Sequence, residues 1–143
     1  MLIREMKEAD IPSVMLIDES AFGKPWSEKS FREEIEKDYS HYIVAEKDGA
    51  PVGYAGIWCI YETAELIRIA TAADFLRCGI ADMMMNVLFE LAEGAECERM
   101  MLEVRESNFG AKKLYLKHGF SEISVRKGYY DGENAIIMEA AVK

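Results

Sequence analysis

Hydrophobic residues alternate with polar ones in several segments of this chain, which predicts strands, and recur every three or four residues in others, which predicts helices. Strand-like runs lie at Leu2–Met6, Tyr42–Lys47, Val52–Ile60, Glu65–Thr71, Met100–Val104, Phe120–Lys127 and Ala135–Val142. Helical patterns run from Ile11 to near Ala21, onward from Ser27, and over Cys78–Glu93 and Asn108–Lys117. The pattern predicts a mixed α/β fold, with a central sheet of six or seven strands and about four helices.

Turn residues indicate how these segments connect. Asp48-Gly49 and Asp131-Gly132 each separate two strand-like runs, which is a strong hairpin signal. The two later helical patterns each stand between strands, so we expect two crossovers that add parallel pairs to the sheet. No repeat or linker interrupts the chain, and 143 residues suit one core. We therefore expect a single domain over residues 1–143.

Composition narrows the classes of function. A net charge of -9 argues against non-specific nucleic-acid binding and is compatible with cationic substrates. No apolar run approaches membrane-spanning length, and the N-terminus lacks the layout of a signal peptide, so a cytoplasmic protein is expected. Cys59, Cys78 and Cys97 are far apart without paired Cys or His residues. We therefore expect neither a disulfide framework nor a metal site.

The segment from Leu102 to Phe120 carries candidate chemistry. Glu103 interrupts an apolar run, and a carboxylate inside a buried strand is costly unless something pairs with it or uses it. Asn108 opens the following helix, and Tyr115 lies two turns further on. Taken alone, these residues fit an exposed strand end and a core aromatic more readily than a site, because buried carboxylates are rare and buried tyrosines are common.

A second candidate is the turn between residues 67 and 82. It leads from a strand into a helix that begins with Gly79 and Ala81, and small residues at a helix start let backbone N–H groups approach an anion. Neither a Walker motif nor a dinucleotide fingerprint is present. Close packing between strand and helix would explain the small residues equally well.

Several motifs together resemble the GNAT family of N-acetyltransferases. The segment 76–81 (LRCGIA) is similar to that family's Q/R-x-x-G-x-G/A motif, which binds coenzyme A. Further matches are PWSEKSF (25–31), LEVRESN (102–108), LYLKHGF (114–120) and RKGYYDGENAIIM (126–138), and they resemble the branch that acetylates the alanine N-terminus of a ribosomal protein. The resemblance spans nearly the whole chain and implies the GNAT fold. Two positions depart from the motif, since Leu76 replaces Gln or Arg and Asp82 replaces a basic or small residue.

The resemblance implies acetyl-CoA as co-substrate and assigns roles to residues. Glu103 matches the general base and Tyr115 the general acid, while Asn108 would hold the pantetheine arm. The thioester would lie near Ile69, Ala70 and Thr71. The pyrophosphate would be bound by the turn of Arg77, Cys78, Gly79, Ile80, Ala81 and Asp82.

The function implied is transfer of an acetyl group to the N-terminal alanine of a ribosomal small-subunit protein, by direct attack of the amine. One alternative is another amine on the same scaffold, such as a lysine side chain, a polyamine or a small metabolite. Another is a degenerate domain that binds coenzyme A or a protein partner without catalysis. The presence of both Glu103 and Tyr115 favours an enzyme, because a pure binding module needs neither.

Overall fold

A seven-stranded sheet with the order β1-β2-β3-β4-β5-β7-β6 forms the centre of the computed structural model, which describes residues 1–142. The strands are β1 (Leu2–Glu5), β2 (Ser40–Lys47), β3 (Ala50–Ile60), β4 (Thr63–Thr71), β5 (Arg99–Arg105), β6 (Ser121–Tyr130) and β7 (Glu133–Ala141). The helices are α1 (Ile11–Phe22), α2 (Glu28–Glu36), α3 (Ile80–Gly94) and α4 (Phe109–Lys117), with short 3-10 turns at Glu8–Asp10 and Ala73–Phe75. The predicted mixed fold is confirmed, and the 3-10 turns are the elements that the pattern did not indicate.

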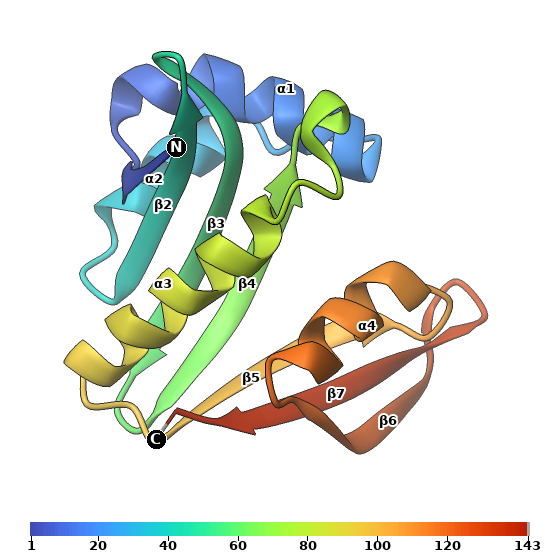
Figure 1. Ribbon diagram of the computed structural model, residues 1–143. Coiled ribbons are helices and arrows are strands. Elements are labelled where there is room, and N and C mark those ends of the chain that lie inside the picture. Colours follow the sequence, from blue (N-terminus) through green and yellow to red (C-terminus); the bar gives the residue numbers. More distant parts are fainter. Residues whose placement is uncertain (143) are drawn as a thin grey trace.

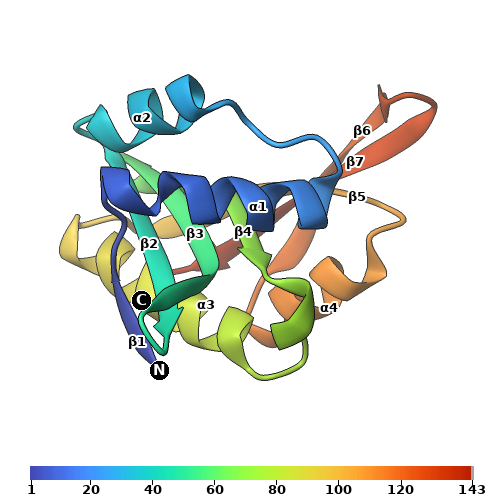
Figure 2. The same ribbon diagram turned by 90° about the horizontal axis from the view of Figure 1, so that it is seen from above.

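Helices cover the two faces of the sheet unequally. α1 and α2 lie on one face, and α3 and α4 on the other (Figures 1 and 2). The core under α3 and α4 draws buried side chains from β2, β3, β4, β5 and β7. The core under α1 and α2 draws its buried strand residues from β2, β3 and β4 within residues 1–142. On the α1 side, the half of the sheet formed by β5, β6 and β7 is therefore left more open. No helix in the described part of the chain is long and apolar enough to cross a membrane.

β4 and β5 form the one parallel pair within residues 1–142, and this pair is short. Its register is Thr63↔Arg99, Ala64↔Met100 and Glu65↔Met101. Beyond Glu65, β4 stays paired with β3 and β5 stays paired with β7, but the two strands no longer pair with each other. They spread apart in a V (Figure 1).

A bulge in β4 falls at the place where the two strands part. Gly56 of β3 is opposite Arg68 and Ile57 is opposite Leu66, so Ile67 is the extra residue. A bulge bends its strand and increases the local twist. This accounts for β4 turning away from β5 after only three paired residues.

The second predicted crossover does not create a parallel pair. α4 leads from β5 into β6, but β7 lies between these two strands and pairs antiparallel with each of them. The β6–β7 hairpin joins the sheet through β7, which pairs with β5 although it follows β6 in the chain. The expectation of two parallel crossovers was therefore wrong for the second one.

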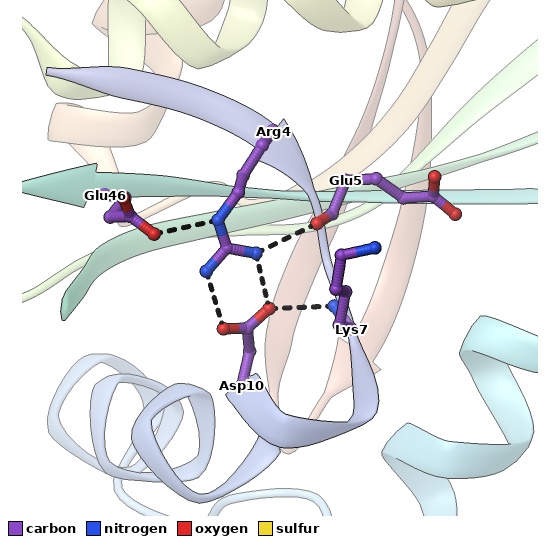
Figure 3. A network of polar contacts seen from close by, with 5 residues as sticks. All are labelled: Arg4, Glu5, Lys7, Asp10 and Glu46. Carbon is purple, nitrogen blue, oxygen red and sulfur yellow. Dashed lines mark hydrogen bonds and ion pairs between the residues drawn. The ribbon is translucent and has the colours of Figure 1, made fainter. Parts of the chain in front are cut away.

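A polar network fastens the N-terminus to the sheet edge (Figure 3). Both terminal nitrogens of Arg4 donate to the Asp10 carboxylate at 2.8 Å, and its Nε donates to Glu46 at 2.8 Å. The hydrogen bonds from Arg4 hold the pKa of Asp10 below its usual value. A depressed carboxyl pKa stabilises the fold above the unfolded pKa, and this contribution is lost as the pH falls through the folded one. The network joins β1, β2 and the start of α1, and it is structural.

Candidate active site

The divergence of β4 and β5 leaves two unpaired backbone edges facing each other. Ile69, Ala70 and Thr71, the predicted thioester residues, lie on β4 within this stretch. Ile69 packs on the core under α3, and Ala70 belongs to the core under α1. The N–H and C=O groups on the β5 side of β4 have no ladder partner there. An elongated ligand with amide groups can pair with such an edge as a strand would.

The turn after β4 presents backbone donors. Arg77 and Gly79 have left-handed φ angles of 63° and 81°, so the helix starts at Ile80 and not at Cys78 as predicted. The backbone N–H of Met83 bonds the Gly79 carbonyl at 3.1 Å and is the first of α3 to find an intrahelical acceptor. The preceding amides of the helix start are available to an anion.

Open space beside Gly79 decides between the two explanations of its small size. A Cβ built there would meet no described atom within 4 Å. Close packing of strand against helix is therefore the wrong explanation for this glycine. The positive φ is what requires it, because residues with a Cβ rarely adopt that conformation.

Asp82 does not point freely into the turn that is predicted to bind phosphate. Its carboxylate accepts from Lys117 Nζ at 3.1 Å and lies 2.8 Å from His118 Nε2. These hydrogen bonds, with His118 the larger cause, lower the pKa of Asp82. The departure from the family motif thus joins the start of α3 to the end of α4. Its charge is balanced by a neighbouring lysine.

Glu103 lies on the open face of β5. Its neighbours Leu102 and Val104 face the core under α3 and α4, so the alternation of a strand turns Glu103 to the side of α1. The side chain is 29% exposed, and its Oε1 is 2.9 Å from Arg126 Nη1 of β6.

Glu65 of β4 lies on the same face as Glu103. Its neighbours Ala64 and Leu66 face the core under α3, and it pairs with Met101, two residues before Glu103. Burial first and the charge of Glu103 second raise the pKa of Glu65.

Aromatic and basic side chains continue this face along β6. Arg126 stacks over the Tyr129 ring at 5.1 Å, and Arg105 stacks over the Tyr130 ring at 4.2 Å. Burial first, and then the Glu103 charge, raise the pKa of Tyr130. Arg126 therefore connects the candidate base to the tyrosine pair at the end of the hairpin. Sequence reasoning missed Arg126, although it lies within one of the family-like motifs.

Tyr115 lies on the opposite face of the sheet from Glu103. It is 7% exposed, belongs to the core under α3 and α4, and packs edge-on against Phe120 at 5.8 Å. Burial raises the pKa of Tyr115 to about 12, so the phenol stays protonated at neutral pH. A reactive group placed between β4 and β5 would thus have the carboxylate on one face and the phenol on the other.

Asn108 has a structural role at the start of α4. Its side-chain oxygen accepts from the Ala111 backbone N–H at 3.2 Å, as an N-cap does. The residue is exposed. Any contact of Asn108 with a cofactor would be additional to this capping bond.

Two hollows of this structure lie away from the candidate residues. One of about 310 Å³ lies at the β1 and β2 edge, beside Met6, Tyr42 and Leu91. Another of about 380 Å³ lies beside Arg99 and Ser121. The candidate residues gather instead along the stretch where β4 and β5 no longer pair.

Comparison with known proteins gives a consistent family. A model of the acetyltransferase (GNAT) family matches residues 11–120. A Bacillus subtilis protein, provisionally described as a ribosomal protein bS18-alanine N-acetyltransferase, is 38% identical over 139 residues, which are 95% of this chain and 92% of that protein. The Escherichia coli ribosomal protein bS18-alanine N-acetyltransferase is 32% identical over 140 residues, 95% of this chain and 94% of its own length. The crystal structure of the ribosomal-protein-S18-alanine N-acetyltransferase from Escherichia coli superposes with a TM-score of 0.91 at 30% identity, over 99% of this chain and 94% of that one.

Proposed function

The chain belongs to the acetyltransferase (GNAT) family, and from this premise we propose that it transfers an acetyl group from acetyl-CoA to the N-terminal alanine of a ribosomal small-subunit protein. The activity as an N-acetyltransferase follows from the family. The observation that carries the proposed site is the parting of β4 and β5 after Glu65, with Glu103 on one face and Tyr115 on the other. The choice of acceptor rests on the names of the relatives.

Acetyl-CoA would bind along the free edge of β4. The pantetheine arm would pair with the backbone of residues 69–71, and Asn108 would contact it from the start of α4. The pyrophosphate would accept hydrogen bonds from the backbone of residues 77–82, where a helix N-terminus favours an anion. The exposed Arg77 supports this placement with a nearby positive charge.

Starting from a protonated amine, the reaction removes two protons from the nitrogen and supplies one to the leaving sulfur. An α-amine with a pKa near 8 is mostly protonated at neutral pH, so Glu103 takes a proton from it, directly or through a water molecule. The free nitrogen then attacks the thioester carbonyl carbon. The tetrahedral intermediate breaks its C–S bond, the leaving thiolate takes the phenolic proton of Tyr115, and the nitrogen loses its second proton to solvent. The products are the N-acetylated chain and free coenzyme A, and solvent returns the two residues to their starting states.

A peptide series tests the acceptor. Peptides that differ only in their first residue, together with one blocked at its N-terminus, are incubated with the enzyme and acetyl-CoA. We expect mass spectrometry to place one acetyl group on the α-amine of the alanine peptide. The blocked peptide should stay unmodified.

Three other outcomes would contradict this proposal. Acetylation of the blocked peptide on a lysine side chain would favour a lysine acetyltransferase. Modification of no peptide, with turnover of a polyamine or a small amine, would favour a small-molecule acceptor. Absence of turnover with every amine, despite coenzyme A binding, would favour a binding domain.

Leu76 offers a test of the phosphate-binding turn. Replacing Leu76 with glutamine should strengthen coenzyme A binding a few-fold, because the amide adds a donor beside the pyrophosphate, at about 1 kcal/mol per hydrogen bond. The side chain is 58% exposed, so the change should leave the fold intact. Leu116→Gln is the matched control, with an equally exposed leucine on α4. Equal or weaker affinity of Leu76→Gln in calorimetry would show that this position contributes no donor.

A further inference from the structure

Arg68 holds the two ends of the segment that joins α1 to α2. Its guanidinium lies 4.4 Å from the ring centre of Phe22, the last residue of α1, and 4.3 Å from that of Trp26, which precedes α2. The two rings and the guanidinium, which we call the Arg68 clamp, fix residues 22–26 to β4. A planar guanidinium stacks on aromatic faces in a way that an ammonium does not.

Asp18 supports the clamp from inside the fold. This carboxylate is fully buried, accepts from the Trp26 backbone N–H at 2.8 Å and receives the Tyr54 hydroxyl. Arg68 Nε lies 3.5 Å from it, and the Arg68 side chain is only 18% exposed. A buried arginine is costly without an opposite charge, so Asp18 explains why one is tolerated here.

The clamp lies on the face of the sheet that carries Glu103. Arg68 is the first residue after the bulge at Ile67, in the part of β4 that has parted from β5. Its contacts are with α1 and the α1–α2 segment, so it points to the face opposite Tyr115. The segment 22–26 therefore borders the side from which an amine would reach Glu103.

Arg68 has a buried donor without a hydrogen-bond partner in the described part of the chain, so apolar packing alone does not account for an arginine at this position. Arg68 Nε is buried and has no hydrogen-bond partner among residues 1–142. A buried donor without a partner costs stability, and an apolar side chain would remove that cost but leave the buried Asp18 carboxylate without its ion-pair partner. The orientation of the guanidinium between the two rings is what an apolar residue would not supply.

We propose that Arg68 is a positioning residue for the acceptor: it fixes the α1–α2 segment beside the parted strands and thereby sets the affinity for the amine substrate, with little effect on acetyl-CoA. The inference rests on the proposed function for the identity of the acceptor. Arg68 acts through Phe22 and Trp26 and takes no part in the proton transfers.

Kinetics separate this role from a general loss of structure. Arg68→Met should raise KM for the alanine peptide about tenfold, because a displaced wall weakens binding of the substrate it borders. kcat and KM for acetyl-CoA should stay within about twofold. Arg68→Lys keeps the charge beside Asp18 but loses the planar stack, so it should give an intermediate KM. It also keeps the test valid if the methionine variant fails to fold. Arg32→Met is the control, since Arg32 pairs with Glu8 and Glu28 on the surface.

A second measurement needs no substrate. The chain has two tryptophans, Trp26 and Trp58, so Trp58→Phe leaves Trp26 as the single reporter. In that background, Arg68→Met and Arg68→Lys should each increase quenching of the Trp26 fluorescence by acrylamide, and Arg32→Met should not.

The outcomes distinguish the inference from the proposed function. The positioning role would be overturned if KM for the peptide were unchanged in both Arg68 variants. It would also be overturned if kcat fell while KM rose for the peptide and for acetyl-CoA alike. Unchanged quenching would overturn the clamp itself. If the wild-type chain acetylates no alanine peptide, the proposed acceptor is wrong, and KM for whichever amine is acetylated then tests Arg68, together with the quenching.

Discussion

Replacing Glu103 with glutamine should lower kcat about a thousandfold, since loss of a general base typically costs a factor of about 10² to 10⁴. Glutamine has the same shape and can still accept a hydrogen bond from Arg126, but it cannot take a proton from the amine. The residue is partly exposed on the open face of β5, so the fold should persist. Steady-state kinetics with the alanine peptide, and calorimetry with acetyl-CoA, would show lost turnover with affinity unchanged within about twofold.

The matched control for this change is Glu106→Gln. Glu106 lies three residues along the same segment, and its carboxylate accepts from Asn134 at 3.1 Å in an exposed position. Its replacement should leave kcat near the wild-type value. If Glu103→Gln also turned over normally, the proton would have to leave by another route. Glu65, the carboxylate on β4 at the end of its paired stretch with β5, would then be the next residue to replace.

Replacing Tyr115 with phenylalanine should lower kcat about a hundredfold, at the lower end of the range for general acid–base catalysis. The change removes only the hydroxyl, and the ring contact with Phe120 can persist. Because burial raises the pKa of this phenol to about 12, the wild-type rate should show no loss from its ionisation at neutral or mildly alkaline pH. Rates measured from pH 6 to pH 10 would test both statements, over a range chosen around the pKa of an α-amine near 8.

Tyr39→Phe provides the comparison for Tyr115. Tyr39 packs edge-on against Trp58 at 5.3 Å, near the start of β2 and away from the parted strands. The Tyr39→Phe enzyme should therefore keep its full activity. A wild-type kcat in Tyr115→Phe would mean that the thiolate departs without a proton from this residue.

Sequence patterns predicted the local elements because the signals for them are local. Asp-Gly pairs at residues 48–49 and 131–132 mark two of the three hairpins, and the apolar spacing within residues 78–93 indicates α3. The same patterns could not give the position of β7 between β5 and β6. That position depends on which strand edges meet, and residues close together in sequence do not encode it.

The candidate site was predicted unevenly for the same reason. Glu103 and Tyr115 were found through family-like motifs, and the structure places them on opposite faces of the parted strands. The contact of Asp82 with His118 spans 36 residues, so no local pattern indicated it. Because Asp82 departs from the family motif, a basic residue at this position would be expected to strengthen coenzyme A binding. The neighbouring Lys117 makes Leu76 the better position, because a new lysine would face an existing one.

The position of α3 under both halves of the sheet affects which acyl groups the protein would select. Three residue pairs are all that join β4 to β5 by backbone, whereas Met84, Met85 and Leu88 of α3 share one core with Leu66 of β4 and Leu102 of β5. The separation of the two strands is therefore governed by side-chain volume in the interior, because packed cores respond to changes as small as one methylene. If acetyl-CoA binds along β4 as proposed, the length of acyl chain that fits between the strands is set by core residues that touch no reacting atom.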